Sequence, residues 1–259
     1  MNSFVDTHCH LDTYEEQTQE SFETLWAKME VKPEAMIQVA CDPHEFEYAK
    51  IMSEKYNFIY AAYGIHPQYV DSYDPTQDEL LKSYLDHPKA VACGEIGLDY
   101  HYGAESKKAQ CFLFEKELDI GLQKGKPLVL HLREAEEDSL SILRNAPIQN
   151  HPIHVHCFTG TPAFAEALLK LSSSIYIGFT GIISFKNAEN VRAAAKIVPL
   201  ERLLLETDAP YLAPVPFRGK PAHSGMIPLI AEHLAQVKSI TKEELLSLCR
   251  ENTRQCYHI

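Results

Sequence analysis

Eight short runs of apolar residues recur along the chain, and each is followed by a longer stretch with helical spacing. Most of these runs are apolar throughout, which is typical of parallel strands that are covered on both faces. Eight such alternations in about 250 residues predict an α/β protein with a TIM-like (β/α)8 barrel. We expect the strands at 4–7, 35–40, 58–64, 90–95, 128–131, 153–157, 174–179 and 203–207.

The intervals between these runs carry helix signals. Phe114, Leu118 and Leu122 recur every four residues, and Gly125 follows as a C-terminal stop. A doubly wound open sheet is the alternative fold, but its glycine-rich phosphate loop is missing. No linker or repeat marks a boundary, so we expect one barrel domain over residues 1–259. Two final helices are expected at 227–237 and 241–255, the second opened by a capping box at Thr241.

The composition excludes several classes of protein. The longest apolar stretches are far shorter than the ~20 residues that a membrane-spanning helix needs. The first twenty residues are rich in acidic and histidine side chains and do not resemble an export signal, so we expect a cytoplasmic protein without membrane contact. Seven cysteines without a CxxC pair indicate reduced thiols. Nothing in the sequence indicates an obligate protein partner.

The net charge of −12, with no Lys/Arg run longer than two, argues against a broad cationic surface for nucleic acid. An anionic substrate would then have to be held by bound cations or by a small basic loop. The 13 histidines favour the cations.

Imidazole and carboxylate groups follow five of the eight predicted strands. Active sites of barrels assemble at the C-terminal ends of the strands, so these side chains are expected to meet there. Both groups are common ligands of divalent cations. The candidate metal ligands are His8, His10, Glu95, His131, His156 and Asp208.

Alternation within the first strand places Asp6, His8 and His10 on one face and turns Cys9 away. Two imidazoles can then converge on one cation, and Asp6, one layer lower, can orient an imidazole N–H. The alternative is a pair of histidines that bond backbone carbonyl groups.

Glu95 carries two oxygens and can therefore bridge two cations. Capping of the next helix or pairing with a nearby base is the alternative for Glu95. Asp208 can ligate one cation and accept a proton from water, which makes it a candidate catalytic base. Glu206 shares the face of Asp208 one layer down, and we assign it a supporting role.

The last positions of the fifth and sixth strands favour His131 and His156 as ligands, whereas His154 lies deeper and is expected to be a hydrogen-bonded core residue. Arg133 shares the face of His131, and its planar fork suits a phosphate or carboxylate oxygen. An ion pair with a neighbouring glutamate is the alternative for Arg133.

His66 follows the third strand, where it can contact a substrate or leaving group as a second candidate catalytic residue, or simply form a turn. Arg218 and Lys220 form a compact basic loop after the eighth strand, which can hold a phosphate or be an ordinary solvated loop. His223 has no assignment. We expect the remaining histidines at the surface: His44, His87, His101, His151, His233 and His258.

Six separated motifs closely resemble those of the TatD family of metal-dependent hydrolases and deoxyribonucleases. The resemblance implies a two-cation site in which Glu95 is the bridge. It also implies that His8, His10 and Asp208 complete one metal site, and that His131 and His156 complete the other. Members are known as divalent-cation nucleases that often trim DNA from the 3′ end. The motifs are VDTHCHLD, GIHP, CGEIGLDY, LHLR, HCFTG and LETDAP.

Two departures from the family pattern fall where substrate is expected. The segment 221–225 replaces the usual basic residue, asparagine and acidic-Pro run, and Leu132 stands where a small or polar residue is common. Because the ligand positions are intact, the metal chemistry is the stronger inference and the substrate the weaker one.

The sequence thus predicts a hydrolase that uses two divalent cations, Mg²⁺, Mn²⁺ or Zn²⁺, about 3.5–4 Å apart, to activate water for attack on a phosphodiester. DNA is the expected substrate, cleaved in the 3′–5′ direction and held locally at the metal site. One alternative is an amide, lactone or ester hydrolase, because the fold and metals do not fix the substrate. Another is a binding protein that retains a structural metal.

Overall fold

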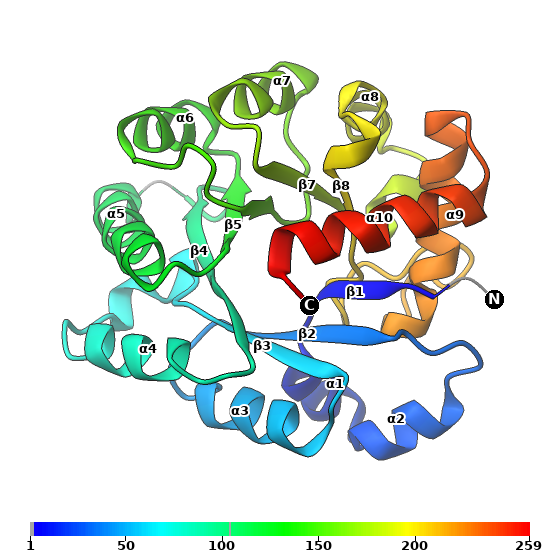
Figure 1. The fold of residues 1–259 in the computed structure, drawn as a ribbon, viewed down its shortest axis with the longest axis horizontal. Helices are drawn as coiled ribbons and strands as arrows, with labels where there is room; N and C mark the ends of the chain where they lie inside the picture. The colour runs from blue at the N-terminus through cyan, green and yellow to red at the C-terminus, as the bar shows by residue number, and fades with distance from the viewer. Residues whose placement is uncertain (1–2, 104) are drawn as a thin grey trace.

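The computed structural model describes residues 3–103 and 105–259. It contains an eight-stranded parallel sheet in the order β1 to β8, so every predicted strand is present and the expected α/β barrel is confirmed (Figure 1). The strands are β1 (Val5–Cys9), β2 (Ala35–Ala40), β3 (Ile59–Tyr63), β4 (Ala90–Asp99), β5 (Leu128–Arg133), β6 (Ile153–Val155), β7 (Ile175–Phe179) and β8 (Leu203–Leu205).

The sheet closes between β1 and the segment that follows β8. An isolated parallel bridge joins Cys9 to Ala209, and the amide of Asp208 donates to the carbonyl of His8 at 2.9 Å. The amide of His10 donates in turn to the carbonyl of Ala209 at 2.7 Å. These bonds exclude the open doubly wound sheet and place the ends of β1 and β8 side by side.

Helices surround the barrel and bury their apolar faces against it (Figure 1). Phe114 and Leu118 are buried, and Gly125 ends their helix in the left-handed conformation with φ of 62°. The helices are α1 (Leu11–Thr18), α2 (Phe22–Lys28), α3 (Phe46–Lys55), α4 (Gln77–Leu85), α5 (Lys107–Lys124), α6 (Glu136–Asn145), α7 (Pro162–Leu171), α8 (Glu189–Ile197), α9 (Ile227–Lys238) and α10 (Lys242–Tyr257).

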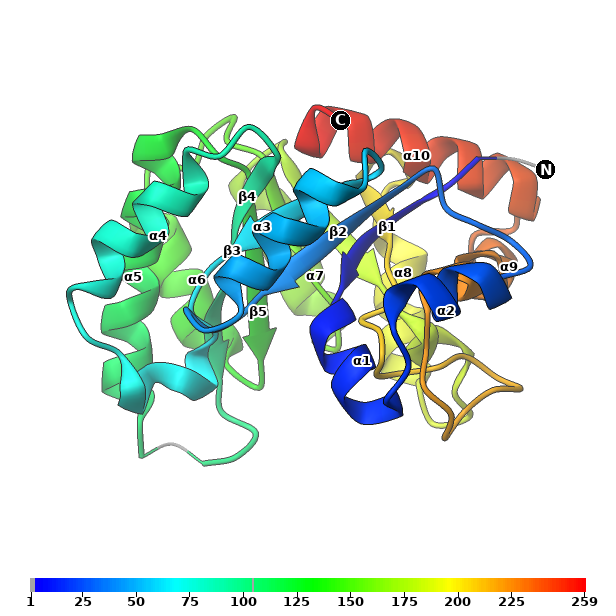
Figure 2. The same cartoon turned by 90° about the horizontal axis from the view of Figure 1, so that it is seen from below.

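The two final helices lie where the sequence predicts them. The Thr241 side chain caps α10 by accepting the amide of Glu244 at 3.2 Å. Figure 2 shows α10 across one end of the barrel, with the strand arrows pointing away from it. The helix therefore closes the end where the strands begin, and the opposite end stays free for a site. No helix within residues 3–103 and 105–259 has the length and apolar character to span a bilayer.

Six strands end at other residues than predicted: β1 and β5 end two residues later, at Cys9 and Arg133, and β3 ends one residue earlier, at Tyr63. β4 runs on past Glu95 to Asp99, because its last residues continue to pair with β5. Gly97 makes this pairing possible: its φ is 142°, and a Cβ there would lie 2.1 Å from the carbonyl oxygen of His131. β6 and β8 end at Val155 and Leu205, two residues earlier than expected.

Candidate metal centre

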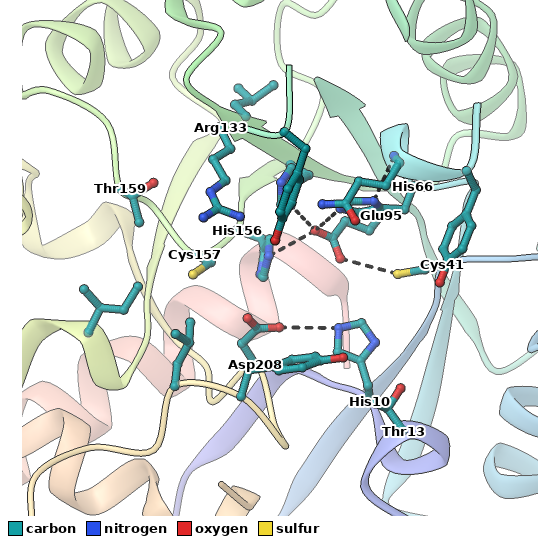
Figure 3. Close-up of a pocket in the computed structure, with 18 of the residues that line it drawn as sticks. His10, Thr13, Cys41, His66, Glu95, Arg133, His156, Cys157, Thr159 and Asp208 are labelled. Carbon is teal, nitrogen blue, oxygen red and sulfur yellow. Dashed lines mark hydrogen bonds and ion pairs between the residues drawn. The ribbon is translucent and has the colours of Figure 1, made fainter. Parts of the chain in front are cut away.

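A pocket of about 420 Å³ opens at the C-terminal ends of the strands (Figure 3). Five of the six candidate ligands line it, and they come from β4, β5 and the segments that follow β1, β6 and β8. The sixth candidate, His8, is fully buried and contacts the same groups. The lining ligand candidates are His10, Glu95, His131, His156 and Asp208.

The first group of donor atoms surrounds one oxygen of Glu95. The Nε2 atom of His8 lies 3.2 Å from Glu95 Oε2 and 3.2 Å from His10 Nε2. The Nε2 atom of His10 lies 3.4 Å from Asp208 Oδ1. Ligand atoms that share a cation at about 2.0–2.2 Å lie ~3.0–3.5 Å from one another. The spacing of this group therefore fits a metal ion.

The second group surrounds the other oxygen of the same carboxylate. Glu95 Oε1 lies 2.5 Å from His131 Nδ1 and 3.1 Å from His156 Nε2. These three donor atoms all lie within 4.8 Å of one another. Each oxygen of Glu95 thus faces its own set of imidazoles, which is the arrangement that a carboxylate shared by two cations requires.

Hydrogen bonds behind the imidazoles fix which nitrogen faces the pocket. The carbonyl oxygen of Val39 lies 3.0 Å from His10 Nδ1, and Glu206 Oε2 lies 3.3 Å from His156 Nδ1. A carbonyl or carboxylate oxygen can only accept, so both Nδ1 atoms must carry the proton. In the neutral rings, the Nε2 lone pairs then face Asp208 and Glu95, where a cation can use them.

The electrostatics of the centre favour positive charge. Burial alone would lower the pKa of His10, but the hydrogen bond and charge of Asp208 raise it to about 9. Burial would raise the pKa of Glu95, but His156, His8 and His131 hold it well below its usual value. Burial also lowers the pKa of His8 to about 4, so this ring is neutral at pH 7 and offers a lone pair. The donor set therefore fits divalent cations in chemistry as well as in spacing.

His66 lines the same pocket and differs from the ligand candidates in its tautomer. Its Nδ1 atom accepts the amide of Gln68 at 3.1 Å, so the proton of the neutral ring is on Nε2. That Nε2 lies 3.7 Å from Glu95 Oε1. Burial lowers the pKa of His66 to about 3, with a further contribution from His131. His66 is therefore placed as a neutral N–H donor beside the second group.

The sequence reasoning missed two residues of this centre. Asp99 Oδ2 lies 3.3 Å from His131 Nε2 and accepts the side-chain amide of Gln68 at 2.7 Å. Asp99 is four residues beyond Glu95 on the same strand, so alternation would have found it had β4 been extended. Cys41 directs its thiol to Glu95 Oε2 at 3.5 Å, and no motif marks this cysteine.

The basic residues predicted to bind substrate are not brought together. Arg133 lines the pocket, 4.0 Å from Asp99 Oδ2 and over the ring of Tyr102 at 5.6 Å, and within the described residues it forms no ion pair with a neighbouring glutamate. Arg218 and Lys220 are exposed and do not line the pocket. Their contact with a longer substrate stays a prediction.

Three residues behind the candidate ligands had predicted roles, and the structure agrees with two of these predictions. Asp6 was expected to orient an imidazole, which is wrong: its carboxylate accepts the amide of Thr207 at 2.9 Å and the hydroxyl of Thr207 at 2.6 Å. Asp6 therefore ties β1 to the segment after β8. Glu206 does support His156 from behind, and His154 is a fully buried core residue as expected.

The histidines expected at the surface are only in part exposed. His44, His101 and His258 are exposed. The other three are partly buried; two of them have polar partners, since His87 Nε2 contacts Glu54 at 3.1 Å and His151 Nε2 contacts a backbone carbonyl at 2.8 Å. The third of them is His233. His223, which the sequence left unassigned, is also partly buried, and its Nδ1 has no partner among the described residues.

A parallel barrel that gathers imidazoles and carboxylates at its strand ends has the architecture of a metal-dependent hydrolase. The family model described as TatD related DNase matches residues 5–258. The uncharacterized metal-dependent hydrolase YabD of Bacillus subtilis is 37% identical over 258 residues, which cover 98% of each chain. The chain therefore belongs to the TatD family and is a metal-dependent hydrolase.

Two further comparisons agree with this assignment. The human 3'-5' RNA nuclease TATDN2 is 35% identical over 272 residues, which cover 99% of this chain and 35% of the human protein. The crystal structure of YJJV, a TatD homologue from Escherichia coli, has a TM-score of 0.87 at 26% identity, covering 99% of this chain and 98% of the other.

Proposed function

We propose that this hydrolase cleaves phosphodiester bonds of DNA from the 3′ end, with two divalent cations, Mg²⁺, Mn²⁺ or Zn²⁺, in its pocket. His8, His10 and Asp208 would hold one cation, His131 and His156 the other, and Glu95 both. The observation that carries the proposal is that each oxygen of Glu95 faces a different set of imidazoles. When bound, the cations would neutralise phosphate charge and promote the ionisation of water.

Three side chains of the pocket supply the remaining chemistry. Asp208 lines the pocket, and its carboxylate can accept the proton that the attacking water releases. His66 presents Nε2–H and can donate to the departing oxygen. Arg133 reaches the pocket from the end of β5, where its guanidinium group can bind a phosphate oxygen.

Three tyrosines around the pocket favour a nucleic acid over a small substrate. Tyr69, Tyr102 and Tyr211 line the pocket and are 41%, 72% and 46% exposed. Each lies beside a residue of the proposed chemistry. The ring centroids of Tyr69 and His66 are 6.3 Å apart, as are those of Tyr211 and His10. The guanidinium group of Arg133 lies 5.6 Å from the ring of Tyr102. Nucleobases stack on exposed aromatic rings without regard to sequence. An acidic protein can thus hold nucleic acid through stacking and bound cations.

A second candidate is hydrolysis of a small amide, lactone or ester. The volume of about 420 Å³ is compatible with it, since pockets for small ligands span roughly 300–1,000 Å³. The same pocket also accommodates the terminal nucleotide of a strand, so the volume does not separate the two candidates.

The test strips the purified chain with a chelator, reloads it separately with Mg²⁺, Mn²⁺ and Zn²⁺, and offers a 5′-labelled single-stranded oligonucleotide. We expect metal-dependent products that shorten stepwise from the 3′ end. A parallel panel of cyclic amides, lactones and esters covers the second candidate. Turnover of that panel without cleavage of the oligonucleotide under any metal would overturn the proposal.

A further inference from the structure

A line of buried polar side chains runs from the metal centre to the opposite end of the barrel. His156 Nδ1 lies 3.3 Å from Glu206 Oε2, and the same oxygen lies 3.1 Å from His154 Nε2. The other nitrogen of His154, Nδ1, lies 2.6 Å from the hydroxyl of Tyr257. All four residues are at most 5% exposed. The line therefore has no contact with bulk water that could satisfy its polar atoms.

Tyr257 belongs to the last turn of α10, which closes the end of the barrel where the strands begin (Figure 2). Its ring packs with Ile37, Val39 and Leu204 in a cluster of the barrel's own strands. Its hydroxyl reaches His154 on β6 across a sequence separation of 103 residues. The C-terminal helix is thus connected to the metal centre through side chains, in addition to its apolar packing.

The chemistry of the four groups determines where the protons lie along this line of side chains. Glu206 is a carboxylate that also accepts the amide of Cys157, so it offers only acceptor atoms. A lone pair on His154 Nε2 would face this negative charge, whereas a proton there is attracted to it. The neutral ring then carries no proton on Nδ1, and that nitrogen accepts the hydroxyl of Tyr257. The Nε2 atom of His154 has no hydrogen bond with proper geometry among the described residues, so its 3.1 Å contact with Glu206 is an electrostatic one.

Gly178 leaves the room that the line needs. A Cβ at this position would lie 2.3 Å from His154 Nε2 and 2.4 Å from Glu206 Oε1, which no side chain could occupy without displacing both. The strand β7 thus presents a residue without a side chain where the imidazole and carboxylate meet. The absence of a side chain at Gly178 therefore allows His154 and Glu206 to approach each other.

We propose that Tyr257 is a positioning residue for His156 and acts through His154 and Glu206. By bonding His154 Nδ1 at 2.6 Å, Tyr257 fixes the ring and stabilises the tautomer that Glu206 favours, with the proton on Nε2. That proton attracts the carboxylate of Glu206 at 3.1 Å, and Glu206 accepts from the ring of His156, whose Nε2 lies 3.1 Å from Glu95. The inference rests on the proposed function only in taking His156 as a metal ligand.

The matched substitutions are Tyr257→Phe and Tyr63→Phe. Both tyrosines are buried, but the hydroxyl of Tyr63 has no hydrogen-bond partner among the described residues. Tyr63→Phe therefore removes a buried hydroxyl without touching the line. Loss of a group behind a metal ligand weakens metal binding by roughly 10- to 100-fold, and we expect about tenfold weaker binding of Mn²⁺ or Zn²⁺ in Tyr257→Phe alone.

Nitrogen NMR of the metal-free wild-type chain reads the tautomer directly. We expect His154 with its proton on Nε2, and a mixture of tautomers in Tyr257→Phe. A wild-type His154 protonated on Nδ1 or on both nitrogens would overturn the inference, as would unchanged metal affinity in Tyr257→Phe measured by calorimetry. Should Tyr257→Phe not fold, the wild-type spectrum still decides.

Neither readout needs turnover, so the two proposals fail separately. A chain that shows the expected tautomer and the expected loss of metal affinity, but cleaves no DNA, would contradict the proposed function and leave this inference standing. DNA cleavage with a different His154 tautomer would do the reverse.

Discussion

Glu95→Gln is the substitution that most directly perturbs the metal centre. The carboxylate oxygens of Glu95 lie 2.5–3.2 Å from nitrogens of His8, His131 and His156, so the change removes one negative charge from the middle of both donor groups. Two unit charges about 4 Å apart interact by about 4 kcal/mol at an effective dielectric constant of 20. The glutamine oxygen still offers a lone pair to a cation, which recovers part of this interaction energy. We expect a loss of at least about 3 kcal/mol, or roughly 100-fold weaker metal binding.

Glu117→Gln is the matched control for this substitution. Glu117 is also buried, and burial raises its pKa well above the usual value, which favours the uncharged form that glutamine mimics. Glutamine also keeps the oxygen that accepts the amide of Ile65 at 2.7 Å. Calorimetric titration of chelator-stripped protein with Mn²⁺ gives the affinity of each variant. Wild-type affinity and stoichiometry in Glu95→Gln, or an equal loss in Glu117→Gln, would refute the reasoning.

Three other predictions concern the metal, the N–H donor His66 and the exposed tyrosine Tyr211. Saturating the stripped chain with metal at about 100 times its dissociation constant adds about 2.7 kcal/mol of stability; scanning calorimetry should show a rise of roughly 5–10 °C in Tm, and no rise would count against a metal centre. His66→Leu removes the N–H donor and should lower kcat by about 10²–10³-fold with unchanged metal content, which loss of a metal would contradict. Tyr211→Leu should raise KM for an oligonucleotide roughly 5- to 100-fold and leave a base-free phosphodiester unaffected, whereas equal effects on both would exclude stacking.

The barrel and the meeting of the six ligand candidates could be predicted from sequence because both follow from local rules. Continuous apolar runs specify parallel strands, and parallel strands of one barrel place their C-terminal ends together. Residues such as His131 and Asp208, which are 77 positions apart, therefore meet without any direct sequence signal between them.

What could not be predicted depends on contacts across the barrel. Asp6 has the correct parity to orient an imidazole, but its partner Thr207 lies 201 residues away across the closing seam, and no periodic pattern specifies that pairing. Asp99 was missed because the strand was expected to end at Glu95, whereas Gly97 permits the close approach of β5 that lets β4 continue. The position of the basic loop that carries Arg218 depends on the conformation of the loop, which the alternation of residues in strands does not predict.

The proposed metal centre requires that the carboxylate of Glu95 stand between two cations. Anomalous diffraction from crystals soaked in Mn²⁺ tests it most directly, with Glu95→Gln crystals as the comparison. We expect two peaks in the wild-type pocket, one on each side of Glu95, with His8 and His10 at the first and His131 and His156 at the second. A single peak, or peaks away from these imidazoles, would contradict it.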